Sequence, residues 1–461
     1  MNFRTKSYLR KRFGDYYNSI EPPLPHDFKR REWGFIFFDE LPEVVMRRHK
    51  AFSSEGEAIE YLRGMVPAHA YHSAAYYQFP GAGTMKEKKW QGADLIFDLD
   101  ADHLPQKVRS YAEMLANVKA ETGKLLDFLL EDFGFDDDNI RVAFSGGRGY
   151  HIHVHDKRVL TLESAQRREI VDYLSGTGLT VDSMFKQTKY VVHEIGNFKK
   201  KEFDAPKKII SFEDEDGPYG WGKRVTEYIL SYLTELSNKE DYIALGDLSF
   251  KILLYYQNPE NFPNNMKDII YQIFQLKIEH PSWNYQRIAQ KIDDISISEL
   301  FIQDILSYGS KAWKIIKIAK NENAIRMIQK DGIVDFKGVP EFLEIILEDA
   351  KTEFGIRMGA KTDEPFTADI RRLIRMPTSL HGGSGMRVVP LTLSEFKTFE
   401  PLRDAVVFSE KEIKIEVLPP LKPQNALVEM KGKSIKVVEG INTVPEYAGI
   451  YLMCRGAAEY A

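Results

Sequence analysis

Hydrophobic and polar positions along the first third of the chain follow two different periods. Short apolar runs with strand character lie at residues 33–38, 70–79 and 93–100, and apolar residues at helical spacing lie at 55–66. Strands that alternate with helices predict a layered α/β architecture. After Pro105, apolar residues recur near helical spacing from Val108 to Leu129, which predicts a long helix with one buried stripe.

Two further strands are predicted on either side of a tight turn. The apolar runs at 140–144 and 150–155 are separated only by residues 145–149, Ser-Gly-Gly-Arg-Gly, a segment too short for anything but a turn. A helix is predicted over 161–178, with Thr161 as its N-cap and with Gly176 and Gly178 at its end.

The pattern changes in the second half of the chain. From about Thr226 to Asp349, apolar residues at helical spacing with few glycines predict an inserted helical subdomain. The α/β pattern resumes over 363–391, and a linker after Pro419 precedes a short β-like tail. The expected organisation is an α/β domain at 1–225 and 350–418, a helical subdomain at 226–349, and a linker with a tail at 419–461.

Composition limits the class of protein without deciding it. The chain has 461 residues, a net charge of −5 and a single cysteine, Cys454. This length suits two or three domains, and one cysteine excludes an intrachain disulfide framework and a Cys-rich zinc site. We find no secretory signal and no apolar run of the ~18 residues that a membrane span requires. We therefore expect a cytoplasmic protein without membrane contact. Because the net charge is negative, any polyanion would have to bind to local clusters of Lys and Arg.

Acidic residues follow the strand predicted at 93–100. Asp98, Asp100 and Asp102 occupy alternate positions, so Asp98 and Asp100 share one face of the strand. Two carboxylates this close repel each other unless a proton or cation compensates them, and hard oxygen ligands favour Mg²⁺ or Mn²⁺. A solvated acidic strand end is the alternative. Because an apolar run lies directly upstream of the acids, we give the metal site and the solvated strand end equal weight.

The turn at 145–149 lies next to three alternating histidines, His151, His153 and His155. The glycines let backbone N–H groups approach a phosphate, while Ser145 and Arg148 offer further hydrogen bonds to it. Neighbouring histidines on one strand face are about 6.5–7 Å apart, which is too wide for one tetrahedral metal ion. We therefore interpret His151 as a phosphate contact and the other two histidines as structural.

A second basic segment precedes another glycine-rich loop. Arg375 and His381 flank a proline turn beside Gly382-Gly383-Ser384-Gly385, and this arrangement suits a triphosphate. Taken alone, it would be a turn with surface arginines.

Taken together, these segments resemble the catalytic (small) subunit of archaeal and eukaryotic-type DNA primases. The resemblance rests on residues 90–105 with the acid pair, on residues 144–156 with the glycine turn, and on residues 363–385, in the family's order. Residues 29–40 also look like an early block of that family. The implied fold is an α/β, mixed-sheet primase catalytic (Prim) domain with an inserted all-helical subdomain.

The resemblance implies roles for individual residues. Asp98 and Asp100 match the family's metal-binding acid pair, and Asp363 takes the place of its third catalytic carboxylate better than Glu364 or Asp369 does. Ser145, Arg148 and His151 match the triphosphate-binding loop. Arg375 and His381 match the basic pair that holds the incoming nucleotide.

The chain also departs from the family pattern. Many members carry a Cys/His zinc cluster shortly after the acid pair, whereas this chain has no cysteine there, which argues against a structural zinc. Eukaryotic members have an additional arginine where this chain has Gly147. The helical insertion is longer than is usual in the family, and the tail has no counterpart that we can align.

The activity that the resemblance implies is de novo synthesis of short RNA primers, or also DNA primers, on single-stranded DNA. The chain would be a two-metal nucleotidyltransferase that uses Mg²⁺ or Mn²⁺ and nucleoside triphosphates. Its expected partners are a primase large subunit, in a heterodimer, and the replication machinery.

Three other functions explain part of the pattern. A primase-polymerase-type repair polymerase would extend existing ends without starting chains. A glycosyltransferase that uses a D-x-D motif to hold a metal on a nucleotide sugar would explain the acids, but it explains the two basic segments less well. An inactive scaffold would be expected to lose at least one acid, and all three are present.

The clearest candidate for template contact is a cluster at 198–208. It contains Lys199, Lys200, Lys201, Lys207 and Lys208 with Phe198 and Phe203. Single-stranded DNA binds to such combinations of basic and aromatic groups. A solvated lysine-rich loop is the favoured interpretation of this cluster, and a template groove is the alternative.

Overall fold

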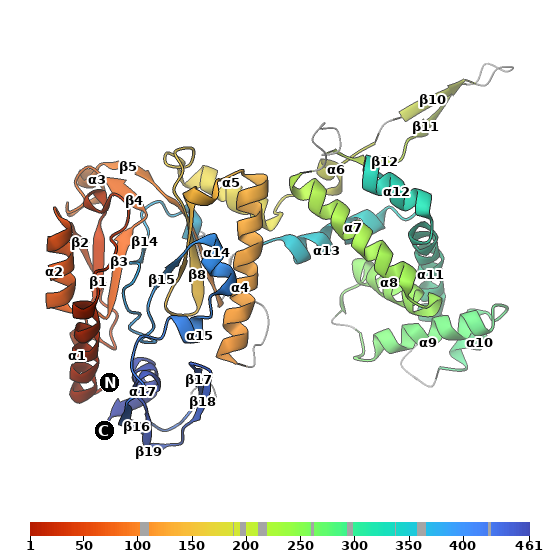
Figure 1. Ribbon diagram of the computed structural model, residues 1–461. Helices are drawn as coiled ribbons and strands as arrows, with labels where there is room; N and C mark the ends of the chain where they lie inside the picture. The colour runs from red at the N-terminus through yellow and green to blue at the C-terminus, as the bar shows by residue number, and fades with distance from the viewer. Residues whose placement is uncertain are drawn as a thin grey trace. The chain divides into compact units, whose positions relative to one another are not determined.

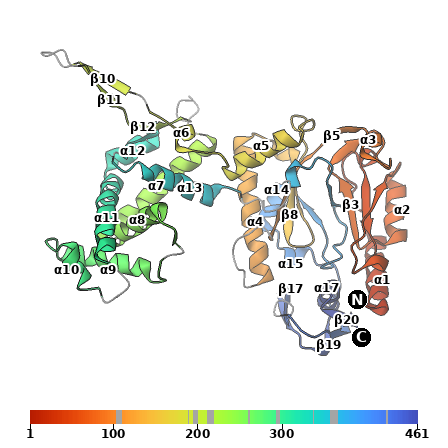
Figure 2. The same cartoon turned by 180° about the vertical axis from the view of Figure 1, so that it is seen from behind.

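The chain folds as two units, Met1–Ser175 with Ile356–Ala461, and Gly176–Gly355. The computed structural model describes residues 1–101, 110–187, 189–193, 200–210, 219–259, 262–292, 298–336, 338–356, 366–422 and 426–461. The first unit contains two four-stranded sheets with helices against them and carries all the described candidate site residues (Figures 1 and 2).

The first sheet has the strand order β14-β3-β1-β2, with β1 at Trp33–Ile36, β2 at Arg47–Lys50, β3 at His69–Ser73 and β14 at Leu373–Arg375. Helices α1 (Phe3–Ser19) and α2 (Glu55–Met65) lie beside it (Figure 1). Its core is aromatic: Trp33 packs edge-on against Phe52, with ring centroids 5.2 Å apart, and Phe35 is also buried. The run predicted at 70–79 divides into β3 and a separate strand β4 (Ala75–Tyr77), which pairs with β5 (Trp90–Ala93) after the short helix α3 (Met85–Lys88).

The second sheet has the order β15-β7-β8-β6, with β6 at Leu95–Asp100, β7 at Ile140–Phe144, β8 at Gly149–Val154 and β15 at Val389–Leu391. Helix α4 (Tyr111–Asp127), extended by one π-helical turn at Phe128–Asp132, packs on β6 and β8. On the other face Ile96 packs with Ile374 of the first sheet and with Ala74, which directly follows β3. Because strand residues alternate between faces, Asp98 and Asp100 lie on the Ile96 side, toward the first sheet.

Two sequence expectations about this unit are wrong in detail. The expected mixed sheet is not found, because every strand pairing among the described residues is antiparallel. Thr161 is not an N-cap, since helix α5 spans Ser164–Ser175. The residue before the helix is Glu163, two positions after Thr161. Its backbone N–H donates to the Gln166 side chain at 2.7 Å, which satisfies one free N–H at the start of the helix. The predicted end is confirmed, because Gly176 and Gly178 follow with φ of +69° and +79°.

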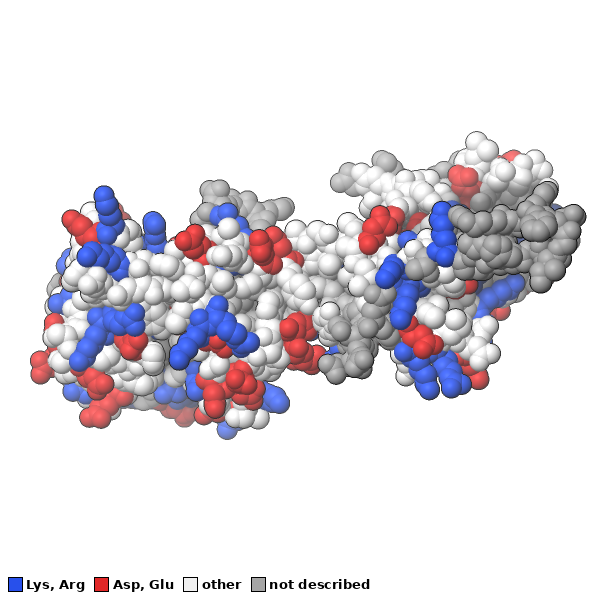
Figure 3. Space-filling model, turned by 90° about the horizontal axis from the view of Figure 1, so that it is seen from above, with Lys and Arg blue, Asp and Glu red and all other residues white. Residues whose placement is uncertain are grey.

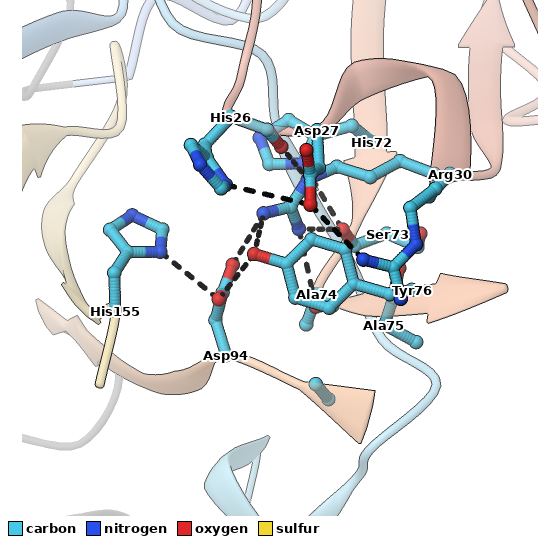
Figure 4. A network of polar contacts seen from close by, with 12 residues as sticks. His26, Asp27, Arg30, His72, Ser73, Ala74, Ala75, Tyr76, Asp94 and His155 are labelled. Carbon is cyan, nitrogen blue, oxygen red and sulfur yellow. Dashed lines mark hydrogen bonds and ion pairs between the residues drawn. The ribbon is translucent and has the colours of Figure 1, made fainter. Parts of the chain in front are cut away.

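A buried ionic cluster joins the segments that precede β1 and β6. Arg31 is fully buried and donates to the Asp94 carboxylate at 2.6 Å and to the Ser73 carbonyl at 2.7 Å. Tyr76 donates to the same carboxylate at 2.7 Å, and His155 lies 3.0 Å from it (Figure 4). A buried charge is tolerated only when it is paired, so this cluster helps to fix β6 and its acids in place.

The C-terminal segment is part of the first unit. After α14 (Leu393–Thr398) and α15 (Pro401–Asp404), strand β16 (Glu412–Val417) pairs with β19 (Gly440–Pro445) and β20 (Ala458–Tyr460), and β17 (Leu427–Met430) pairs with β18 (Lys433–Lys436). The tail was expected to be only β-like, but it also contains the buried helix α17 (Glu446–Cys454). The two chain ends lie together (Figure 1), and the Glu459 carboxylate accepts the Asn2 N–H at 2.8 Å.

The second unit combines helices with short strands. It contains α6 (Val181–Met184), β9 (Phe185–Lys186), β10 (Lys189–His193), β11 (Lys200–Asp204), β12 (Lys207–Ile209), α7 (Gly220–Asn238), α8 (Asp241–Tyr256), α9 (Met266–Glu279), α10 (Tyr285–Ala289), α11 (Glu299–Ala319), α12 (Glu322–Asp331), β13 (Ile333–Val334) and α13 (Glu341–Phe354). The helices predicted at 226–349 are present, but the unit begins at Gly176 and is not wholly helical. The lysines at 200–208 belong to strands β11 and β12, while Phe198 and Lys199 lie outside the described residues.

Charges on the surface are mixed in sign. On the face shown in Figure 3, Lys and Arg side chains alternate with Asp and Glu, in keeping with the small net charge of −5. Among the helices that the structure describes, none combines the length and the apolar character needed to span a bilayer.

Candidate active site

A cavity of about 490 Å³ opens in the first unit, where β6 and β8 meet the end of β14. It is lined by seven of the residues singled out in the sequence: Asp98, Asp100, Ser145, Arg148, His151, Arg375 and His381. The first and the last of these residues, Asp98 and His381, are 283 positions apart in the chain. Asp363, the eighth, lies outside the described residues.

The two acids project side by side from the end of β6. Asp98 is opposite His151 in the register of β6 and β8, and Asp100 is opposite Gly149. The Asp98 Oδ1 atom is 3.4 Å from His151 Nε2, and the Asp100 Oδ1 atom is 3.6 Å from Arg148 Nε. Burial, together with nearby Arg375, lowers the pKa of His151 to about 3, so its imidazole is neutral.

Hydrogen bonds to its carbonyls hold the glycine turn between β7 and β8. Ser384 Oγ donates to the Gly146 carbonyl, and the Tyr111 hydroxyl donates to the Gly147 carbonyl, both at 2.5 Å. The turn itself is closed by the Ser145 N–H, which donates to the Gly149 carbonyl at 2.9 Å. The loop shape is therefore fixed before any anion binds, which lowers the entropic cost of binding.

His381 has a defined tautomer. Its Nδ1 accepts the Gly383 N–H at 3.1 Å, so the proton of the neutral ring resides on Nε2. Burial lowers the pKa of His381 well below its usual range, and the charge of Arg375 adds to this. A Cβ atom placed on Gly147 would lie 2.9 Å from His381 Nε2, so the Nε2–H faces the glycine turn. A larger side chain at position 147 would therefore require movement of His381.

Three residues that support the glycine turn or Arg375 were not assigned a role from the sequence. His69, on β3, places its Nδ1 2.6 Å from Arg375 Nη1, and burial keeps its pKa well below the usual value, so it accepts a hydrogen bond from the guanidinium. Tyr111 and Ser384 bind the glycine turn, as described above. All three are common residue types with no motif spacing, and only the tertiary fold reveals their contacts.

His153 and His155 do not share a site with His151. The ring centroids are 6.3 Å apart for His151 and His153 and 6.0 Å apart for His153 and His155. His153 is buried beside His72, whereas His155 pairs with Asp94. Their positions agree with a structural role for both.

A second cavity, of about 420 Å³, shares Asp98, His151 and Arg375 with the first. Its other lining residues include three arginines, Arg48, Arg371 and Arg372. Asp98 therefore lies where two basic cavities meet.

We expect Gly146→Ala to destabilise the protein, because the substitution would distort the glycine turn. Gly146 has φ of +74°, and a Cβ atom there would lie 2.8 Å from His381 Cβ and 3.1 Å from the Met386 carbonyl oxygen. The backbone conformation alone costs a non-glycine residue about 1–2 kcal/mol, and the contacts add to this. Gly134→Ala is the matched control, because Gly134 also has positive φ (+59°) but open space around it. Equal shifts of the two urea midpoints would contradict the expectation.

Comparison with known proteins identifies the family. The sequence model of the DNA primase small subunit family matches residues 97–393, which include the acid pair and both basic segments. The chain is 42% identical over 461 residues to the DNA primase small subunit PriS of Methanococcoides burtonii, and both chains are covered completely. It is also 42% identical to the proteins of the same name from Methanosarcina acetivorans (470 residues aligned) and Methanosarcina barkeri (468 residues aligned), in each case covering 100% of this chain and 98% of the relative. The chain belongs to the DNA primase small subunit family.

Primase small subunits are nucleotidyltransferases that synthesise RNA primers, so the cavity with the acid pair belongs to a primer-synthesising enzyme. This assignment also excludes the glycosyltransferase alternative for the D-x-D pattern, because glycosyltransferases are a different family. The primase match ends at residue 393, whereas the cavity is also lined by Lys422, Cys454 and Arg455.

Proposed function

We propose that this primase small subunit joins nucleotides by two-metal catalysis, with Asp98, Asp100 and Asp363 as the metal ligands. The donor set fits a hard divalent cation, since Asp98 and Asp100 offer carboxylate oxygens from adjacent same-face positions of one strand. Within the described ranges no group of three such ligands converges, and the proposed third ligand, Asp363, lies outside those ranges. Mg²⁺ or Mn²⁺ bound there would activate the attacking 3′-hydroxyl and stabilise the leaving pyrophosphate.

The observation that carries this proposal is the place of Asp98 between two cavities. Nucleotidyl transfer needs two substrates, an incoming triphosphate and an acceptor hydroxyl, on either side of the acids. The cavity with the glycine turn offers anion contacts through Ser145, Arg148 and His381. The second cavity, with its additional arginines, suits the phosphodiester backbone of the acceptor.

The basic and polar residues of the first cavity would hold the triphosphate in line for attack. Arg148 and Arg375 supply permanent positive charge, and the neutral ring of His381 donates from Nε2. Such preorganised donors stabilise charge that develops on the phosphates and the leaving group. His69 is a positioning residue, because it acts on the substrate only through Arg375.

We further propose that the chain acts on single-stranded DNA with a primase large subunit, in a cytoplasmic replication assembly. The family supports a DNA template, nucleoside triphosphates and a replication context. The helical part of the second unit and the C-terminal strands are the candidate docking surfaces for the large subunit.

Synthesis without a primer tests the proposed function. The wild-type chain, with and without a large subunit, is incubated on homopolymer templates with ribonucleotides or deoxyribonucleotides and with Mg²⁺ or Mn²⁺. We expect labelled dinucleotides and longer products in the absence of any primer. Extension of existing ends without dinucleotide formation would instead favour the repair-polymerase alternative.

A further inference from the structure

The C-terminal segment forms part of the wall of the nucleotide cavity. Lys422, Cys454 and Arg455 line the same cavity as the acid pair and the glycine turn. All three lie beyond residue 393, where the match to the family ends. The proposed triphosphate site is therefore larger than the segment by which the family is recognised.

Helix α17 is firmly attached to the rest of the first unit. Its first residue, Glu446, is buried and accepts hydrogen bonds from Arg12 Nε at 2.6 Å and from the Tyr8 hydroxyl at 3.0 Å. A Cβ atom on Gly385 would lie 2.6 Å from Ile450 Cγ2, so the helix packs directly against the glycine loop that follows His381. The end of α17, and with it Arg455, thus has a fixed position beside the cavity.

Arg455 lies next to the tyrosine that binds the glycine turn. Its guanidinium carbon is 5.2 Å from the centroid of the Tyr451 ring and 5.9 Å from that of Tyr111. The Tyr111 hydroxyl in turn donates to the Gly147 carbonyl of the turn. Contact with aromatic rings orients a guanidinium, so the positively charged group of Arg455 is held at the wall of the cavity.

The family segment supplies only part of the permanent positive charge that lines the cavity. A nucleoside triphosphate carries about four negative charges, and fixed positive groups at its oxygens give the strongest contacts. Among the described lining residues within 97–393, Arg148 and Arg375 are the ones with permanent positive charge. Arg455 and the exposed Lys422 would double that number.

We propose that Arg455 and Lys422 bind the triphosphate of the incoming nucleotide, so that the C-terminal segment completes the substrate site. This inference rests on the proposed function and adds two substrate-binding residues to it. Arg455 offers a planar fork to two phosphate oxygens, whereas Lys422 offers a point charge from the rim.

The test compares Arg455→Ala, Arg455→Gln and Lys422→Ala with the matched control Lys433→Ala. Lys433 belongs to the same C-terminal segment but pairs with Glu410 at 3.0 Å and does not line the cavity. We expect each Arg455 variant to raise the KM for the nucleoside triphosphate on the order of ten-fold, as for loss of one charged hydrogen bond, with a smaller change in kcat. Lys422→Ala should raise the KM less, and Lys433→Ala should leave it unchanged.

Binding of a fluorescent nucleoside triphosphate and of the matching monophosphate identifies the part of the ligand involved. Arg455→Gln should weaken triphosphate binding and leave monophosphate binding nearly unchanged. Wild-type affinity in all three variants, or equal losses for both ligands, would overturn the inference. Because Arg455 and Lys422 are exposed, these variants should fold, and a thermal melt checks this. Failure of the wild-type chain to make primers in the same assay would instead contradict the proposed function itself.

Discussion

Asp98→Asn is expected to abolish primer synthesis while the protein remains folded. The substitution keeps the size of the side chain but removes its negative charge at the meeting point of the two cavities. Loss of a charged metal ligand removes several kcal/mol of transition-state stabilisation, which corresponds to a decrease in kcat of about 10³-fold or more. Radiolabelled nucleotide incorporation on a homopolymer template measures the effect.

The control for this experiment is Asp137→Asn. Asp137 is an exposed acid in the turn before β7 and does not line either cavity. Both variants should melt at the wild-type temperature, because the Asp98 carboxylate is partly exposed and lies close to a second acid. An Asp98→Asn variant with normal turnover would exclude the assigned role of the acid pair.

The sequence was sufficient to find the separate parts of the site. The apolar run before Asp98 and the glycines between two strands are local signals, and the structure has β6, β7 and β8 close to the predicted positions. The residues of the third segment, Arg375 and His381, reach the same cavity through the pairing of β14 with β3. No local pattern specifies that pairing.

The errors have physical causes. Antiparallel and mixed sheets present the same strand patterns in a sequence, so the pairing of β6 with β8 could not be read from periodicity. Helix α17 was taken for part of a β-like tail because it is buried on nearly all sides. Its apolar residues therefore show no helical stripe, and a short apolar run does not distinguish a buried helix from a strand.

Supporting residues are the part of the site that sequence reasoning misses most readily. Tyr111 acts through a hydrogen bond to the glycine turn, and His69 acts through hydrogen bonds with Arg375 and with the Gly382 N–H. A tyrosine at the start of a helix or a histidine on a strand is ordinary in any protein. Arg455 is a similar case, since it lies in a tail far from every motif.

Asp94→Asn is expected to destabilise the first unit by about 3–5 kcal/mol, because it leaves a buried guanidinium without its counter-charge. The side chains of Arg31 and Asp94 are 0% and 1% exposed, and their closest atoms are 2.6 Å apart. The backbone carbonyls of His26, Ser73 and Ala74 would still accept hydrogen bonds from Arg31, but they carry no full charge. The shift of the urea midpoint measures the loss.

A surface pair provides the comparison. Arg10 and Asp39 are 3.5 Å apart and are 46% and 74% exposed. Asp39→Asn should therefore cost about 0–1 kcal/mol. Equal losses for the two variants would show that the Arg31–Asp94 contact is no more important than a solvated pair.

The effect of Asp94→Asn should also depend on pH. The charge of Arg31 holds the pKa of Asp94 below its ordinary value of 3.8, even though burial opposes this. A carboxyl group with a lowered pKa in the folded state stabilises the protein above the pKa of the unfolded chain, and this contribution is lost as the pH falls below it. The difference between wild type and Asp94→Asn should thus be constant from pH 7 to about pH 5 and should narrow below about pH 4.

Replacing both partners separates the loss of a pair from the exposure of an unpaired charge. In Arg31→Met with Asp94→Leu, neither site retains a charge, so the double variant should recover part of the stability that Asp94→Asn loses. Primer synthesis by the double variant provides the second measurement, since Asp94 directly precedes β6 and its acids. Recovered stability with reduced turnover would show that the ionic cluster positions Asp98 and Asp100. Recovery of both stability and turnover would show that the cluster acts only in folding.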